Sequence, residues 1–224
     1  MKTRQTGFTL VEIAIVLVII GLLLGGILKG QEMINQAKIK NVISDFNGIS
    51  AAYYGYQDRY RQIPGDDPGA ATRWVGSGHV SSGAGGTPGN GVLEGKYNNL
   101  VAAPPTFESN LFWEHLRLAG FVSGSGGQQP NNAATGMIGV QTGDAAGGAA
   151  GAMGGFTGLI MCSANLPDKI AVAVDTQMDD GQNDKGQVRG QKQAGSNPDI
   201  KAALVAGDAY VEDGTSQYTL CRGL

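Results

Sequence analysis

The sequence predicts an α+β protein in which one long N-terminal helix packs on a small antiparallel sheet with long glycine-rich loops. An apolar run of membrane-spanning length lies close to the N-terminus. Further along, apolar and aromatic residues recur every three or four positions, as they do on one face of a helix. Short branched segments separated by turn signals then fill the last third of the chain, which is typical of strands.

The apolar run covers residues 8–28 and follows a short polar segment that carries Lys2 and Arg4. As a helix it is about 31 Å long, which matches a hydrocarbon core of about 30 Å. The positive-inside rule keeps the cationic flank in the cytoplasm and places the rest of the chain across the membrane. Glu12 is the only charge in the run. A carboxylate in such a span costs about 2.5–3.5 kcal/mol, so we expect it to have a functional partner.

Two alternatives to an assembly helix are a secretory signal peptide and a plain anchor. A signal peptide ends in small residues of the Ala-x-Ala type, and no such site closes this run. A plain anchor leaves Glu12 unexplained. Cleavage between Gly7 and Phe8 creates an α-amine at Phe8, which can neutralise the Glu12 carboxylate within one chain or between neighbouring chains.

The segment KTRQTGFTLVE, residues 2–12, resembles the N-terminal signal of type IV pilins and type II secretion pseudopilins. The resemblance implies a pilin-like fold, cleavage by a prepilin peptidase between Gly7 and Phe8, and methylation of Phe8. It implies that Glu12 contacts the N-terminal amine of an adjacent subunit in a helical filament. The implied partners are other copies of the chain, the peptidase, the inner membrane before assembly, and the pilus or secretion assembly machinery. The implied location is the bacterial inner membrane for the single-pass precursor, then a periplasmic or extracellular filament.

Four glycines lie within or just after the run and form two small-xxx-small pairs, Gly21 with Gly25 and Gly26 with Gly30. Such pairs let helices approach closely, although each Gly costs about 1 kcal/mol of helix stability relative to Ala. The alternative is that Gly is simply frequent in membrane helices. The family resemblance favours packing in a filament core.

The second half of the predicted helix carries a continuous stripe, which indicates a helix docked across a sheet. Pro64 ends the helix, which we expect to cover residues 8–61. The predicted organisation is a leader at 1–7, a membrane and filament-core segment at 8–28, an amphipathic segment at 29–63 and a head at 64–224. The stripe consists of Ile39, Val42, Phe46, Ile49, Tyr53, Tyr56 and Tyr60.

The head is predicted to hold little regular structure before its strands. Residues 65–110 are expected to be loop, and 123–158 are a glycine-rich tract that cannot bury a dense core. A short amphipathic helix is expected at 111–119, where the Trp113-Glu114-His115 cluster is assigned to packing. The predicted strands are Phe156–Cys162, Lys169–Val174, Ala202–Ala206 and Gln217–Cys221.

Cys162 and Cys221 are expected to form a disulfide, because the periplasm is oxidising. The closed loop of about 60 residues then stabilises the fold by on the order of 4 kcal/mol. In the pilin family a C-terminal disulfide holds the variable tail to the sheet, and this pair fits that place. No Cys-x-x-Cys pattern suggests redox activity.

One acidic segment is a candidate calcium site, and no other cofactor is expected. Oxygen-rich loops suit Ca²⁺, and major pseudopilins have a loosely similar C-terminal calcium loop. The segment lacks the EF-hand order of ligands, so a solvated turn is the alternative. Its carboxylates are Asp175, Asp179, Asp180 and Asp184.

Composition narrows the function further. The 37 glycines among 224 residues have no three-residue period, which excludes a collagen-like chain, and a net charge of −3 without basic runs argues against nucleic-acid binding. No phosphate loop, nucleophile elbow or triad appears, so we do not expect an enzyme. The predicted function is a structural subunit of a type IV pilus-like filament. The alternatives are a type II secretion pseudopilin or minor pilin, and a membrane-anchored periplasmic binding module that does not polymerise.

Overall fold

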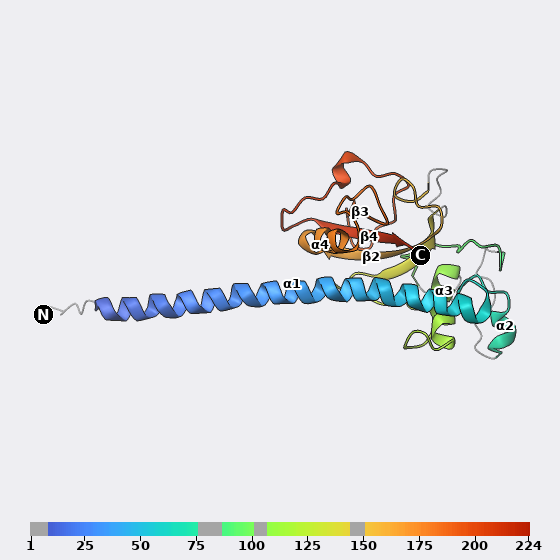
Figure 1. Cartoon of the computed structure of the whole chain (residues 1–224), viewed down its shortest axis with the longest axis horizontal. Helices are drawn as coiled ribbons and strands as arrows, with labels where there is room; N and C mark the ends of the chain where they lie inside the picture. Colours follow the sequence, from blue (N-terminus) through green and yellow to red (C-terminus); the bar gives the residue numbers. More distant parts are fainter. Residues whose placement is uncertain (1–8, 76–86, 101–106, 144–150) are drawn as a thin grey trace, which may run out of the picture. The chain divides into compact units, whose positions relative to one another are not determined.

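The computed structural model describes residues 9–75, 87–100, 107–143 and 151–224 (Figure 1). Within them the fold is α+β, as predicted, with one long helix and a small antiparallel sheet. The chain divides into two compact units between Lys38 and Ile39. The first contains the apolar part of the long helix, and the second contains the rest of that helix with the head.

Helix α1 runs from Leu10 to Tyr60 without a break, which confirms the long helix apart from Phe8, which lies outside the described residues. Its end follows from the backbone of Arg61, whose φ of 57° is left-handed, with Pro64 three residues on. Tyr60 is only half-buried. The other six stripe positions are buried, as predicted: Ile39, Val42, Phe46, Ile49, Tyr53 and Tyr56.

The sheet has four antiparallel strands in the order β1-β2-β4-β3. The C-terminal strand, β4, therefore lies in the interior of the sheet, between β2 and β3 (Figure 1). One face shares a core with the stripe of α1, and the other is covered by loops that form a second core around Tyr97 and the disulfide. Burial on both faces hides the alternation that normally identifies a strand. The strands are β1 (Ile138–Thr142), β2 (Leu159–Pro167), β3 (Val188–Lys192) and β4 (Gln217–Gly223).

The prediction of a strand at Lys169–Val174 is wrong, because this segment is part of helix α4 (Asp168–Met178). Its alternating small and branched residues also fit a helical face, since Ile170, Ala171 and Val174 are all buried on one side. Pro167 directly before the helix and an acidic residue in its first turn both favour a helix start.

Strands β1 and β3 were not predicted, and β1 lies in the tract expected to bury nothing dense. All five β1 residues are buried, although the strand includes Gly139 and Gln141. Gly139 is required by close approach, since a Cβ there would lie 2.0 Å from the backbone oxygen of Tyr97. Gln141 is satisfied by the Tyr97 N–H, which donates to its Oε1 at 3.1 Å. Strand β1 was therefore missed because it has glycine and polar residues at positions where β-branched residues are typical of a strand.

The remaining elements agree in part with the prediction. Strand β4 and helix α3 (Glu108–Leu118) confirm the expected strand and short helix, and β2 starts three residues later than expected. The prediction of a strand at Ala202–Ala206 is wrong. These residues form no strand, and the last of them begins a short 3₁₀ helix, η2 (Ala206–Asp208). The described part of the expected loop at 65–110 holds one four-residue helix, α2 (Ala70–Arg73), and the first residues of α3.

Candidate functional site

The first unit of the chain exposes almost all of its apolar side chains. Exposed fractions reach 85% at Leu10 and 72% at Leu22, and even Met33 is 64% exposed. Among the described residues, α1 is the one helix long and apolar enough to cross a membrane, with a mean hydropathy of 2.8 over its most apolar window. Such a surface is stable only in lipid or against other apolar surfaces.

Glu12 lies in the first turn of α1 and caps its own helix together with Thr9. The Thr9 backbone N–H and hydroxyl both donate to Glu12 Oε2, at 2.8 and 2.6 Å. In return, the Glu12 N–H donates to Thr9 Oγ1 at 3.3 Å. This reciprocal arrangement is a capping box, with Thr9 as N-cap and Glu12 at the third helical position. In the single chain the carboxylate is therefore held by donors from its own chain.

The predicted cleavage residues, Gly7 and Phe8, lie outside the described residues. The four glycines of the small-xxx-small pairs are described, and none is required by a contact within the chain. A Cβ at any of them would meet nothing within 4 Å. Their role in packing against other helices therefore stays a prediction. The glycines are Gly21, Gly25, Gly26 and Gly30.

The acidic segment after α4 brings together three of its four predicted carboxylates. Ligand atoms of Asp175, Asp179 and Asp180 all lie within 4.8 Å of one another, whereas Asp184 is not part of this group. Asp179 Oδ2 accepts the Gln187 and Val188 N–H groups. The group therefore closes the loop between α4 and β3 by itself, and it also has the chemistry of a hard-cation site.

Asp175 is the buried member of this group. Its two oxygens accept the Tyr210 hydroxyl at 2.5 Å and the Gly181 N–H at 3.3 Å. Burial raises the pKa of Asp175 to about 6, which the Tyr210 and Gly181 hydrogen bonds oppose and the charges of Asp180 and Asp179 reinforce. A cation placed beside Asp175 would relieve that unfavourable charge.

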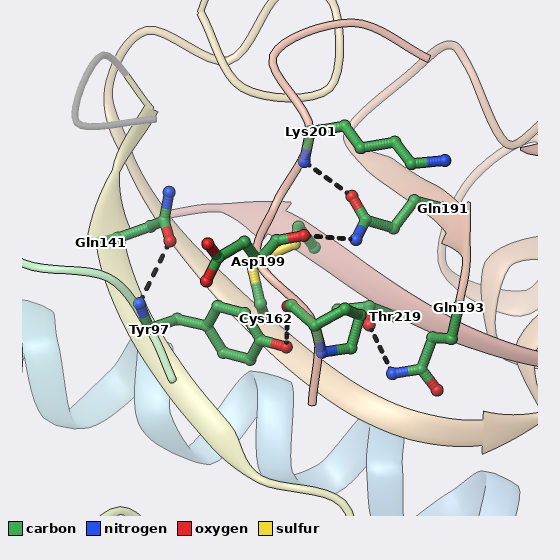
Figure 2. The surroundings of a disulfide bond; sticks show 10 residues. Tyr97, Gln141, Cys162, Gln191, Gln193, Asp199, Lys201 and Thr219 are labelled. Carbon is green, nitrogen blue, oxygen red and sulfur yellow. Dashed lines mark hydrogen bonds between the residues drawn. A yellow bond between two sulfur atoms is a disulfide. The ribbon is translucent and has the colours of Figure 1, made fainter. Parts of the chain in front are cut away.

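Cys162 and Cys221 form the expected disulfide, and both are fully buried. They lie directly opposite each other on β2 and β4, so the bond links two interior strands. Figure 2 shows Tyr97 beside the disulfide. The Tyr97 hydroxyl donates to the Pro198 carbonyl at 2.7 Å. In the same view Gln191 Nε2 donates to the Asp199 carbonyl at 2.8 Å. These contacts hold two loops over the bond and make it part of the second core.

His115 packs inside the head, as the sequence analysis assigned it. Its Nδ1 accepts the Gly65 N–H at 2.9 Å, and its ring stacks on Tyr56 with the planes 12° apart. Burial lowers the pKa of His115 to about 4, so the ring is neutral at physiological pH. These contacts place the exit of α1 against α3 within the head.

Thr9 is the functional residue that sequence reasoning missed. Its signal was present, because Thr9-Leu10-Val11-Glu12 has the Ser/Thr-x-x-Glu spacing of a capping box directly before an apolar helix. The sequence prediction paired Glu12 with an N-terminal amine, whereas in the single chain its hydrogen-bond donor is Thr9, three residues earlier.

Comparison with known proteins gives one match. The model of the prokaryotic N-terminal methylation motif matches residues 2–28. These residues include the leader, Gly7, Phe8, Glu12 and the apolar run. No curated protein and no solved structure matches the chain.

Proposed function

We propose that this chain, which carries the prepilin-type signal of type IV pilins and pseudopilins, is a structural subunit of a type IV pilus-like filament. The motif supports a type IV pilin or pseudopilin precursor and points to a structural protein family rather than an enzyme. The observation that carries the filament role is an exposed apolar helix, Leu10–Leu28, with a single carboxylate near its start.

The exposed helix explains both states that we propose for the protein. In the precursor, lipid of the inner membrane covers the apolar surface, and the cationic leader stays on the cytoplasmic side. After a prepilin peptidase cuts between Gly7 and Phe8, the same surface can be covered by the helices of other copies. The glycine pairs would then let those helices pack closely.

Glu12 supplies the register of the polymer in this proposal. In the single chain its carboxylate accepts two hydrogen bonds from Thr9, which reduces the cost of placing a charge in an apolar setting. The amine created at Phe8 is a stronger partner, because it carries a full positive charge. Pairing between Phe8 of one subunit and Glu12 of the next would fix how far adjacent helices are displaced.

A pseudopilin or minor pilin uses the same signal and the same helix, and differs in abundance and in the machinery that it serves. A membrane-anchored binding module that never polymerises would keep Met1 and would have no use for Glu12. The two classes therefore differ in what happens when Glu12 is changed.

The test is the variant Glu12→Ala, with Glu32→Ala as its control. Glu32 is an exposed carboxylate of the same helix, and within the described part of the chain it accepts only the Gln36 side-chain amide, at 3.0 Å. We expect Glu12→Ala to accumulate in the membrane and to yield almost no filaments in sheared surface material, while Glu32→Ala assembles like the wild type. Normal filaments from Glu12→Ala would contradict the proposal.

A further inference from the structure

A polar groove lies beside the head half of α1, where the helix passes the turn that precedes β1. Its volume is about 290 Å³, and it is open to solvent. The helix contributes short polar side chains at positions three and four apart, which leave room for an incoming group. The lining residues are Asn41, Ser44, Asp45, Asn131, Asn132 and Ala133.

The turn that forms the other wall is held in place by Asn132. Its Oδ1 accepts the Ala134 and Gly136 N–H groups at 2.8 and 2.9 Å. Its Nδ2 donates to Ser163 Oγ at 2.8 Å and to the Ala164 carbonyl at 2.7 Å, which ties the turn to β2. The groove is therefore preformed, and its remaining polar side chains have no hydrogen-bond partner among the described residues.

Asp45 is the only charged residue of the groove, and it has no partner within the described part of the chain. It is half-buried, yet no described hydrogen-bond donor or cation contacts its carboxylate. Burial raises the pKa of Asp45, with no nearby charge to oppose the shift. A carboxylate placed this way costs stability in the single chain, which suggests that its partner comes from outside.

The apolar run of α1 is followed by three lysines that have no carboxylate partner among the described residues, Lys29, Lys38 and Lys40. By contrast, the carboxylate-paired cations among the described residues are Arg61, Arg73, Lys96 and Lys201. Lys29 directly follows Leu28, so burial of the run by neighbouring helices brings its ammonium into a setting where it needs an anion. Within the described residues, the chain thus has an unpaired carboxylate in a groove, and it has unpaired ammonium groups on α1 beyond the surface proposed to pack against copies.

We propose that this groove is an interface between subunits, in which Asp45 binds the ammonium group of a lysine on α1 of a neighbouring copy. The proposal rests on the filament function proposed above and names a second contact besides the pairing of Phe8 with Glu12. The amide and hydroxyl groups of Asn41, Ser44 and Asn131 complete the surroundings of the ammonium, which offers three donors.

The first test is carbodiimide cross-linking of intact wild-type filaments, because this reagent joins a carboxylate to an amine only when they are in contact. We expect a dimer on a denaturing gel and a peptide in which Asp45 is joined to Lys29, Lys38 or Lys40. The dimer separates a link between chains from one within a chain. Filaments whose Asp45 stays unlinked, or is linked to a different protein, would overturn the assigned occupant.

The second test compares Asp45→Asn with Asp58→Asn. Asp58 is a matched control, since it lies on the same helix and its ion pair with Arg61 is solvent-exposed. We expect roughly tenfold fewer filaments from Asp45→Asn, as for loss of one partner of a partly buried charge pair, and little change from Asp58→Asn. Exchanging the charges of Asp45 and the cross-linked lysine should restore assembly.

A folding defect is distinguished by the melting temperature of the unassembled protein in detergent. Asp45→Asn should match or exceed the wild type, because it removes an uncompensated half-buried charge. A lower melting temperature together with the loss of filaments would assign Asp45 a purely structural role and overturn the proposal. Wild-type cells without filaments would contradict both proposals, whereas wild-type filaments that do not need Asp45 contradict only this one.

Discussion

Glu12 Oε2 accepts both the backbone N–H and the hydroxyl of Thr9, at 2.8 and 2.6 Å. Because the two residues are three positions apart on the helix, the Glu12 N–H also donates to Thr9 Oγ1. The Glu12 carboxylate, the single charge of the apolar run, is thus stabilised by hydrogen bonds at the start of its own helix. The proposed assembly depends on one step, in which Glu12 gives up its hydrogen bonds with Thr9 and pairs with the charged amine of a neighbouring subunit.

Loss of the Thr9 hydroxyl should loosen the start of α1. Thr9→Val removes the side-chain half of the capping box, which is worth about 1 kcal/mol, while Thr9→Ser retains it. We expect the Glu12 amide of Thr9→Val to exchange with solvent about fivefold faster in detergent micelles, measured by NMR. Equal exchange rates in the valine and serine variants would show that the hydroxyl does not cap the helix.

The Gly139→Ala variant should destabilise the head strongly. An alanine Cβ would lie 2.0 Å from the Tyr97 backbone oxygen, so either β1 or the loop over the disulfide must move. We expect a loss of about 3 kcal/mol in the free energy of unfolding, measured by denaturant titration. Gly158→Ala is the control, because a Cβ there meets nothing within 4 Å. Equal stability of the two variants would contradict the close packing of Tyr97 on β1.

The fold was predictable where side chains repeat with a clear period. The stripe from Ile39 to Tyr56 identified the docked half of α1, and β4 was identified by its branched and aromatic residues. Lys169–Val174 failed because alternation over five residues also fits a helix face, and local sequence could not tell which one the head would bury. Tertiary contacts decided the outcome.

Strands β1 and β3 were unpredictable for a different reason. They contain Gly139 and Gly190 at points where another segment passes close, and buried amides at Gln141 and Gln191 that bind covering loops. Such residues are stable in a strand only after those loops are in place. The candidate assembly residue Glu12 was easier to predict, because a lone acid in an apolar run can be recognised from the sequence itself. The groove at Asp45 was not visible, because the turn that forms its second wall is 86 positions away.

The stability of the head should fall with rising pH because of Glu108. This carboxyl is fully buried, and no donor among the described residues contacts its Oε1. Burial together with the Glu94 carboxyl raises the pKa of Glu108 to about 8. The folded state therefore binds a proton that the unfolded state releases near pH 4.5. Stability from this group is present at low pH and is lost as the pH rises to about 8, by up to about 1.4 kcal/mol per pH unit.

Glu108→Gln should flatten this dependence, because glutamine resembles the protonated acid. Above pH 7.5 two other buried groups contribute little to the slope, because Asp175, with its pKa of about 6, and His115, whose ring is neutral in the folded state, have released their protons in both states. Unfolding titrations between pH 7.5 and 8.5 therefore isolate Glu108. Glu212→Gln, at an exposed position, should keep the wild-type slope. An unchanged slope in Glu108→Gln would show that Glu108 is ionised in the folded protein.

The acidic loop after α4 is expected to hold its structure without a metal. Asp179 binds two amides of the loop, and Asp175 binds Tyr210 and Gly181, so the carboxylates already have donors. We expect millimolar calcium or a chelator to leave the melting temperature unchanged. We also expect Asp179→Asn to lower it under both conditions, because the loop loses a charged acceptor. A rise with calcium that Asp179→Asn abolishes would instead establish the calcium site.

The central claim is that the chain is cut and polymerised through its N-terminus. Mass spectrometry of the N-terminal peptide from sheared surface filaments tests it most directly. The account predicts an abundant fibre whose subunit begins at N-methylated Phe8, with residues 1–7 absent. Surface material without such fibres, from cells in which the protein retains Met1 in the membrane, would contradict it.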